Sequence, residues 1–160
     1  MKLNTDGSTQ GNIGKAGCGG LIRNHHGEWI WGYARALGNT NNFVAELWAL
    51  REGLAISKEL GLNNLIVELD ALSVVMLMNN NFVNLLMELL LTDCRNSLQS
   101  FPSKKVVHTF REANQCTDVL ARLGARSDPS FVVFLNPLPV VASLLAFEKF
   151  DMCCNRLVYS

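Results

Sequence analysis

The stretch that decides the fold is VAELWALREGLAISKELGLNNLIVELDA, residues 44–71. In its first half the apolar residues recur at intervals of three and four, the period of one helical face, and the pattern stops at Gly61. The run NLIVELD that follows, residues 64–70, is almost continuously apolar, as in strands buried on both faces. A long helix from Asn42 followed by a buried strand predicts a crossover unit of an α/β sheet.

Upstream of this unit, the sequence predicts three antiparallel strands. Residues 2–6 form a short strand, and the Gly-rich stretch GSTQGNIGKAG, residues 7–17, is typical of a loop. Two further extended runs, CGGLIRN (18–24) and EWIWGYARAL (28–37), are separated by HHG at 25–27, which is a hairpin pattern. Both histidines of this turn are expected to be exposed.

Downstream, the pattern predicts a short helix over ALSVVMLMN (71–79), a second helix over about 84–100, a strand at KKVVHTF (104–110) and a closing helix over ANQCTDVLARLGAR (113–126). The order is then three strands, helix, strand, two helices, strand and helix. This order predicts a mixed α/β domain with a hairpin meander first and crossover units after it.

The domain organisation follows from length and composition. A chain of 160 residues with 49% hydrophobic and 18% charged residues fits one globular domain, expected over 1–128. Residues 129–160 differ, because they combine three prolines with a long apolar run and no charge between Phe131 and Phe147. We expect this C-terminal tail to dock on the domain or to bind a partner.

Charge and cysteine content limit the function classes. The formal net charge is zero, so nucleic acid would have to bind a local patch, for which the sequence offers Lys104, Lys105, Arg111, Arg122 and Arg126. Five cysteines without C-x-x-C spacing indicate a reduced, intracellular protein, nuclear or cytoplasmic. No signal peptide or membrane span is apparent, and we expect a monomer without a membrane partner.

Four acidic residues stand at the ends of the expected elements: Asp6, Glu46, Asp70 and Asp118. The surroundings of Glu46 and Asp70 are apolar, and desolvated carboxylates need a positive partner. Clustered carboxylates could bind Mg²⁺, and three or four of them can hold two such ions for phosphoryl chemistry.

Three structural alternatives remain open from spacing alone. Asp6 could be the first residue of an Asp-Gly turn. Glu46 could be a first-turn acid that complements the helix macrodipole. Asp70 could be the N-cap of the helix that follows.

Four phrases in order, KLNTDGS, GCGGLIRNHHGEWIWGYARALG, VAELWALREGLAISKELGLNNLIVELDA and VVHTFREANQCTDVLARLG, resemble the ribonuclease H family, in particular its plant retroelement type. The resemblance covers about residues 2–126. It implies a five-stranded mixed sheet flanked by helices, dependence on Mg²⁺ with Mn²⁺ as a substitute, and cleavage of the RNA strand of RNA/DNA hybrids.

The resemblance also implies roles for individual residues. Asp6, Glu46, Asp70 and Asp118 would be the catalytic, metal-binding carboxylates of a two-metal mechanism. Recognition of the substrate would involve Gly7, Ser8, Asn42, Arg111 and Asn114. For Asn42 a helix N-cap is the alternative to a minor-groove contact, and for Arg111 a surface pair with Glu112 is the alternative to a phosphate contact.

The sequence also departs from the family. The loop TFREANQC contains no histidine, and His108, on the preceding strand, is interpreted as structural. Residues 79–93 carry no positive charge, so we expect modest and salt-sensitive affinity. Trp29, Trp31 and Trp48 are interpreted as core aromatics. A catalytically weak or inactive module that binds nucleic acid or protein therefore remains the alternative to an active nuclease.

Overall fold

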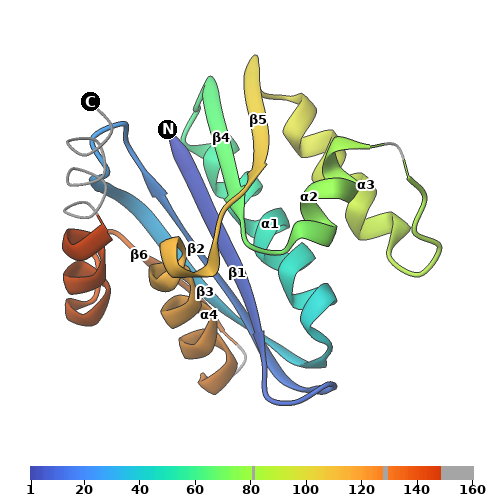
Figure 1. Ribbon diagram of the computed structural model, residues 1–160, viewed down its shortest axis with the longest axis horizontal. Coiled ribbons are helices and arrows are strands. Elements are labelled where there is room, and N and C mark those ends of the chain that lie inside the picture. The colour runs from blue at the N-terminus through green and yellow to red at the C-terminus, as the bar shows by residue number, and fades with distance from the viewer. Residues whose placement is uncertain (81, 128–129, 149–160) are drawn as a thin grey trace.

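A single mixed sheet forms the centre of the computed structural model, which describes residues 1–80, 82–127 and 130–148 (Figure 1). Its six strands are β1 (Lys2–Thr9), β2 (Gly14–Arg23), β3 (Trp29–Thr40), β4 (Asn64–Leu69), β5 (Ser103–His108) and β6 (Phe131–Phe134). Their order across the sheet is β5-β4-β1-β2-β3-β6. Strands β4 and β5 run parallel to β1, and the pairs β1–β2, β2–β3 and β3–β6 are antiparallel.

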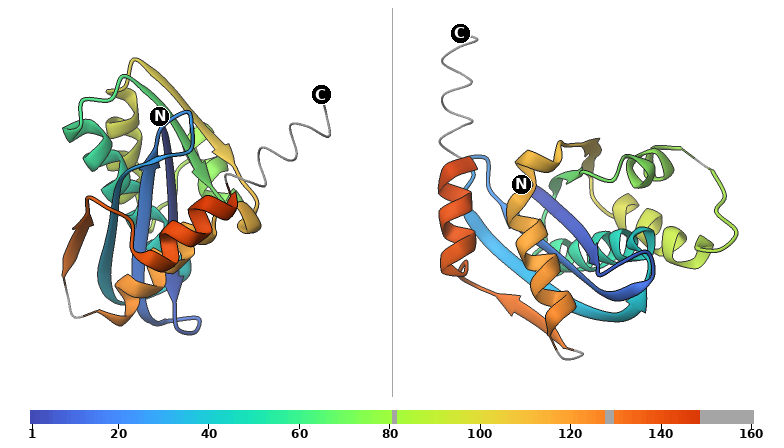
Figure 2. Two further views of the ribbon diagram at one scale, coloured as in Figure 1. Left: turned by 90° about the vertical axis from the view of Figure 1, so that its left-hand side faces the viewer. Right: turned by 60° about the horizontal axis from the view of Figure 1, so that its bottom comes forward.

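Helices cover both faces of this sheet (Figure 2). They are α1 (Asn42–Glu59), α2 (Leu72–Asn79), α3 (Glu88–Gln99), a 3-10 turn (Arg111–Ala113) and α4 (Gln115–Arg126), and residues 139–148 are helical as well. Helix α1 packs on β1 and β2 from one face, and α4 packs on β1, β2 and β3 from the other. The larger core lies on the α1 side, where α2 and α3 complete it.

The expected fold class is confirmed. The meander of three antiparallel strands, the long helix that ends before Gly61, and the crossover to a strand parallel to β1 all occur in the expected order. His25 and His26 are exposed at the hairpin turn, and the three tryptophans are partly buried. The described cysteines, Cys18, Cys94 and Cys116, are buried free thiols.

Two element boundaries and the burial of one strand differ from the expectation. Strand β1 continues to Thr9 and β2 begins at Gly14, so most of the expected loop is a β-hairpin whose strands stay paired as far as Thr9 and Ala16. Strand β4 is buried on one face only, with Ile66 exposed, because α4 packs over β1 to β3. Helix α3 begins at Glu88 because the side chain of Asn84 accepts the backbone N–H groups of Leu86 and Met87 in a turn.

The expected number of five strands is wrong by one, because part of the C-terminal tail forms β6. This strand pairs with β3, in a register that places Phe131 beside Arg35. The helical residues 139–148 then pack on α4, where Val141 and Leu145 join Leu120 in a second, smaller core. Residues 130–148 thus contribute to the fold, while residues 149–160 lie outside the described residues.

No helix among the described residues has the length and apolar character needed to cross a membrane.

Candidate active site

Asp6 and Asp70 come together where the pairing of β1 with β4 ends. The register runs from Lys2 opposite Ile66 to Thr5 opposite Leu69, so the next residue on each side is an aspartate. Parallel neighbours carry their side chains to the same end of the sheet. The Asp6 side chain is buried, and Asp70 is half-buried.

Glu46 reaches the same point from α1 because the helix approaches β1 very closely. A β-carbon built on Gly7 would lie 2.5 Å from the backbone carbon of Ala45 and from the backbone nitrogen of Glu46, so only glycine permits this contact. The Glu46 side chain is 4% exposed. Carboxylate oxygens of Asp6, Glu46 and Asp70 all lie within 4.8 Å of one another.

The electrostatics of these three residues, the acid cluster from here on, are unfavourable without a cation. Burial raises the pKa of Asp6 to about 7, and the charges of Asp70 and Asp118 act in the same direction. Burial and the neighbouring Asp6 raise the pKa of Glu46 well above its ordinary value. The pKa of Asp70 is raised as well, again by burial, although a hydrogen bond from Asn114 and the charge of Arg111 oppose the shift.

The acid cluster fits a divalent cation. One buried oxygen of Glu46, Oε2, has no hydrogen-bond partner among the described residues. Carboxylate oxygens are the ligands that hard cations such as Mg²⁺ take, and a bound cation would satisfy this oxygen and offset the mutual repulsion. The residues present therefore suit a metal ion of that class.

Asp118 lies beside the acid cluster and is not one of its three members. It belongs to α4, which approaches β2 so closely that a β-carbon on Gly19 would lie 2.6 Å from the nitrogen of Ala121. The Asp118 carboxylate forms an ion pair with Arg122, one turn farther along the helix, with 3.1 Å between Oδ2 and Nε. Its charge nevertheless raises the pKa of both Asp6 and Asp70.

The structural alternatives left open by the sequence do not occur. Asp6 lies inside β1 and not at a turn. The first turn of α1 contains no acidic residue, so Glu46 does not act there on the macrodipole. Ala71, not Asp70, is the N-cap of α2, and no side chain caps that helix. The N-cap of α1 is Asn41, whose side chain accepts the N–H of Val44, so Asn42 is not the cap.

A cavity of about 480 Å³ opens over the acid cluster, and Asn42, His108 and Arg111 line it together with the acids. His108 is exposed at the carboxyl end of β5, where its ring stacks edge-on against Phe110. Its side chain therefore lies on the wall of the cavity, a position that the sequence interpretation did not anticipate. The available signal was positional, since the last residue of a strand parallel to β4 lies at the same sheet end as Asp70.

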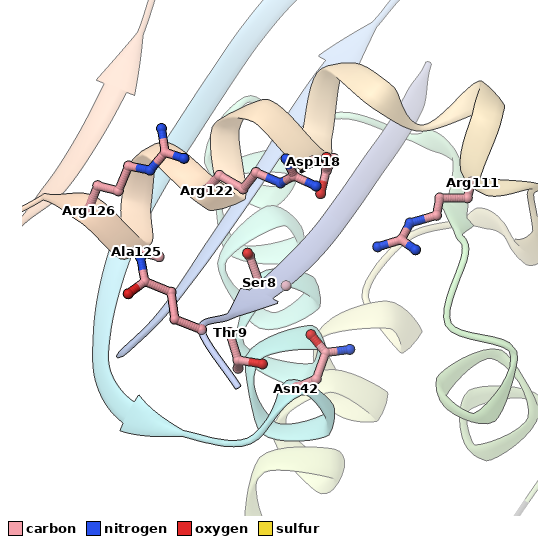
Figure 3. Close-up of a pocket in the computed structure, with 10 residues that line it drawn as sticks. Ser8, Thr9, Asn42, Arg111, Asp118, Arg122, Ala125 and Arg126 are labelled. Atoms are coloured by element: carbon pink, nitrogen blue, oxygen red, sulfur yellow. Dashed lines mark ion pairs between the residues drawn. The ribbon is translucent and has the colours of Figure 1, made fainter. Parts of the chain in front are cut away.

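A second cavity of about 300 Å³ adjoins the first and shares Gly7, Asn42 and Arg111 with it. Figure 3 shows Arg122 and Arg126 projecting from α4 on one side, with Ser8, Thr9 and Asn42 opposite. The three arginines of this cavity, Arg111, Arg122 and Arg126, are called the arginine wall below.

The basic patch expected from the sequence is divided in the structure. Lys104 pairs with Leu65 at the start of β5, whereas His108 at the end of the strand pairs with Leu69 beside the site. Four residues of parallel strand separate the two positions by roughly 13 Å. Lys104 and Lys105 thus lie far from the arginine wall.

Two further residues expected to bind the substrate, Asn114 and Arg111, differ in their position relative to the two cavities. Asn114 is 1% exposed and lines neither cavity; its amide donates to the carbonyl of Thr5, and its side chain also forms a hydrogen bond with Asp70. Arg111 lines both cavities, and no ion pair with Glu112 forms within the described part of the chain.

The chain matches the family model described as reverse transcriptase-like over residues 4–124. Among curated proteins, one from Arabidopsis thaliana that carries the provisional name of a ribonuclease H protein is 32% identical over 122 residues. That match includes 76% of this chain and 20% of the relative, so the chain spans about a fifth of the relative's length.

Solved structures share the fold. Ribonuclease H1 of the archaeon Halobacterium salinarum is 22% identical with a TM-score of 0.72, over 77% of this chain and 95% of that one. The N-terminal ribonuclease H domain of a Mycobacterium tuberculosis protein is 25% identical with a TM-score of 0.72, over 78% and 94%. LC11 ribonuclease H1, solved in complex with an RNA/DNA hybrid, is 24% identical with a TM-score of 0.72, over 78% and 95%.

Proposed function

We propose that this chain, which belongs to the reverse transcriptase-like family and carries a ribonuclease H-like domain, hydrolyses the RNA strand of RNA/DNA hybrids. The observation that carries the proposal is the acid cluster, whose three carboxylates converge within 4.8 Å at a cavity. A fold that needed these positions only for stability would gain from neutral residues there, because desolvated like charges destabilise it. Their presence is explained if they bind the ions that perform chemistry.

Asp6, Glu46 and Asp70 would hold a divalent cation, for which we propose Mg²⁺ with Mn²⁺ as a substitute. The charge of Asp118 already raises the pKa of Asp6 and of Asp70. Once its ion pair with Arg122 is broken, Asp118 would help to hold a second ion. When bound, such ions activate water and stabilise the leaving oxygen of a phosphodiester.

The chain's own residues orient the substrate around this centre. Gly7 and Ser8 offer a polar strand segment close to Asp6, and Asn42 lines both cavities, across from Arg122 (Figure 3). Contacts of this kind suit the ribose 2′-OH, which distinguishes RNA from DNA. His108, exposed on the wall of the metal cavity, would contact the substrate beside the reacting phosphate.

The test is cleavage of a labelled RNA/DNA hybrid in Mg²⁺ and in Mn²⁺ at low salt, with an Asp70→Asn protein purified in parallel. We expect the wild type to cut the RNA strand and to leave 5′-phosphate and 3′-hydroxyl ends, and the variant to leave the hybrid intact. Equal cleavage by both proteins would indicate a contaminating host nuclease.

If the folded wild type binds the hybrid without cutting it, the chain is a binding module that retains a metal site. Duplex DNA and duplex RNA of the same sequence serve as substrate controls, because the proposal requires the RNA strand of a hybrid to be the one that is cut.

A further inference from the structure

The second cavity, which the arginine wall lines, is called the groove below. Its lining residues differ in charge from those of the cavity over the acid cluster. Three arginines and one acidic residue, Asp118, line the groove, and its other polar lining comes from Ser8, Thr9, Gln10 and Asn42. The acid cluster itself contributes none of the lining residues of this cavity. A cavity with this excess of positive charge next to an acidic one can bind an anion without competing for the metal ions.

Two of the three residues of the arginine wall follow one another along α4. Arg122 and Arg126 are four residues apart on α4, so their side chains lie on the same side of the helix, about 6 Å apart along its axis. Figure 3 shows the Arg122 side chain reaching back to Asp118 and Arg126 one turn farther from Arg111. A phosphodiester strand that enters at the acid cluster would therefore meet two guanidinium groups in succession.

These groups are available for a ligand. Arg126 forms no ion pair within the described residues, and Arg122 is 56% exposed while it pairs with Asp118. An exposed pair of this kind within one helix is weak and is readily exchanged for a phosphate. Guanidinium groups match the geometry of phosphate oxygens better than any other side chain.

We propose that Arg122 and Arg126 bind successive phosphates of the strand that is cut, outside the metal centre, and so hold that strand along α4. This inference rests on the proposed function, because it takes a nucleic-acid strand as the occupant. In a chain with zero net charge, the affinity for the nucleic-acid strand would then come mainly from two residues in the C-terminal half of α4.

The experiment measures binding and not cleavage. A fluorescently labelled RNA/DNA hybrid is titrated by anisotropy into the Asp70→Asn protein in Ca²⁺, over a series of salt concentrations. We expect Arg126→Gln to weaken binding about fivefold to tenfold at low salt and to reduce the slope of log K against log salt by about 1. Arg122→Gln added to Arg126→Gln should reduce the slope by about 2 in total.

The matched control is Lys105→Gln, which removes the same charge from an exposed residue far from the groove. It should change affinity less than twofold, and Arg126→Lys should restore most of the slope because the charge returns. An Arg126→Gln protein that behaves like Lys105→Gln would overturn the inference.

The two proposals fail differently. If the wild type binds with the expected slope but never cuts hybrid, the proposed nuclease is wrong and the arginine wall stands. If the wild type cuts hybrid while Arg126→Gln leaves the salt slope unchanged, the nuclease stands and the arginine wall is wrong. Thermal unfolding of each variant verifies that binding is compared between folded proteins.

Discussion

Strands β1 and β4 carry two sets of polar residues, two positions apart. The carboxylate of the first set has hydrogen-bond and ion-pair partners, whereas the carboxylates of the second set lie against one another. Asn4 donates to Glu68 at 2.9 Å, whereas the residues two positions later, Asp6 and Asp70, face each other as like charges. Glu68 also forms an ion pair with Lys2, with 2.9 Å between Oε1 and Nζ. The first pair is compensated and the second is not.

The compensated set extends into a buried network. Arg23 donates to Asn4 and to Glu148, both at 3.0 Å, although Arg23 and Glu148 are each less than a tenth exposed. Burial alone would raise the pKa of Glu68, but hydrogen bonds from Lys2 and Asn4 outweigh it and hold that pKa below its ordinary value. The same two strands thus place a cation beside Glu68, whereas at Asp70 the charge of Arg111 and the hydrogen bond from Asn114 do not outweigh burial, and the pKa stays raised.

The largest expected effect is on chemistry. Asp6→Asn should reduce cleavage of the hybrid about ten thousandfold, which corresponds to about 5.5 kcal/mol of transition-state stabilisation lost with a central metal ligand. Single-turnover cleavage in Mg²⁺ measures it, with anisotropy as the control that the hybrid still binds. Cleavage within tenfold of wild type would show that Asp6 is not a ligand of the reacting ions.

The compensated network should respond in stability instead. Arg23→Leu leaves Glu148 buried without its cation and should lower the free energy of unfolding by about 3–5 kcal/mol, as measured by urea denaturation. Adding Glu148→Leu should recover most of that loss, because the uncompensated charge is gone. Asp93→Asn, which breaks the more exposed pair with Arg51, should cost about 1 kcal/mol or less. Equal losses in the two single variants would contradict the difference in burial.

Addition of a divalent ion should act on the acid cluster alone. At a concentration 100 times its dissociation constant, Mg²⁺ should raise the free energy of unfolding by about 2.7 kcal/mol, measured by urea denaturation against an EDTA control. Asp6→Asn should lose this gain, while the Arg23→Leu protein should keep it. A gain of equal size in the Asp6→Asn protein would place the ion elsewhere.

Sequence patterns could predict the elements and the acids, because both depend on local periodicity and on the cost of an apolar environment for a carboxylate. They could not choose between a turn and a site for Asp6, since that depends on the register that places Asp6 beside Asp70. The position of His108 at the cavity was missed for the same reason. Periodicity predicts a strand there, but only the direction of β5 relative to β4 shows which of its ends carries the site.

The tail was the least predictable region. An apolar stretch with prolines fits a docked segment and a partner surface equally well, and its composition does not reveal that residues 131–134 pair with β3. Removal of these residues would uncover Leu120 and the core around it, so a truncation at residue 128 tests stability as much as partner binding.

The smallest expected effect is the response of stability to pH, and its sign differs between the two sets. Without divalent ions, the pKa of Asp6 is about 7 in the folded chain and near 4 in the unfolded one, and the pKa of Glu46 is raised as well. The folded chain then binds more protons than the unfolded chain between about pH 4 and pH 7, so this cluster lowers stability as pH rises through that window. Glu68, whose pKa is lowered, stabilises the fold above the pKa of its unfolded form, and that stabilisation is lost as pH falls.

Urea midpoints in EDTA at pH 5 and pH 7.5 separate the two contributions. Asp6→Asn should flatten the decline between these values, because asparagine does not titrate and the repulsion on Glu46 is relieved. Glu68→Gln should leave that decline in place and reduce the loss of stability below about pH 4.5. A wild-type protein that becomes more stable from pH 5 to pH 7.5 in EDTA would mean that the acid cluster already has a cation from the chain, and the contrast between the two sets would then disappear.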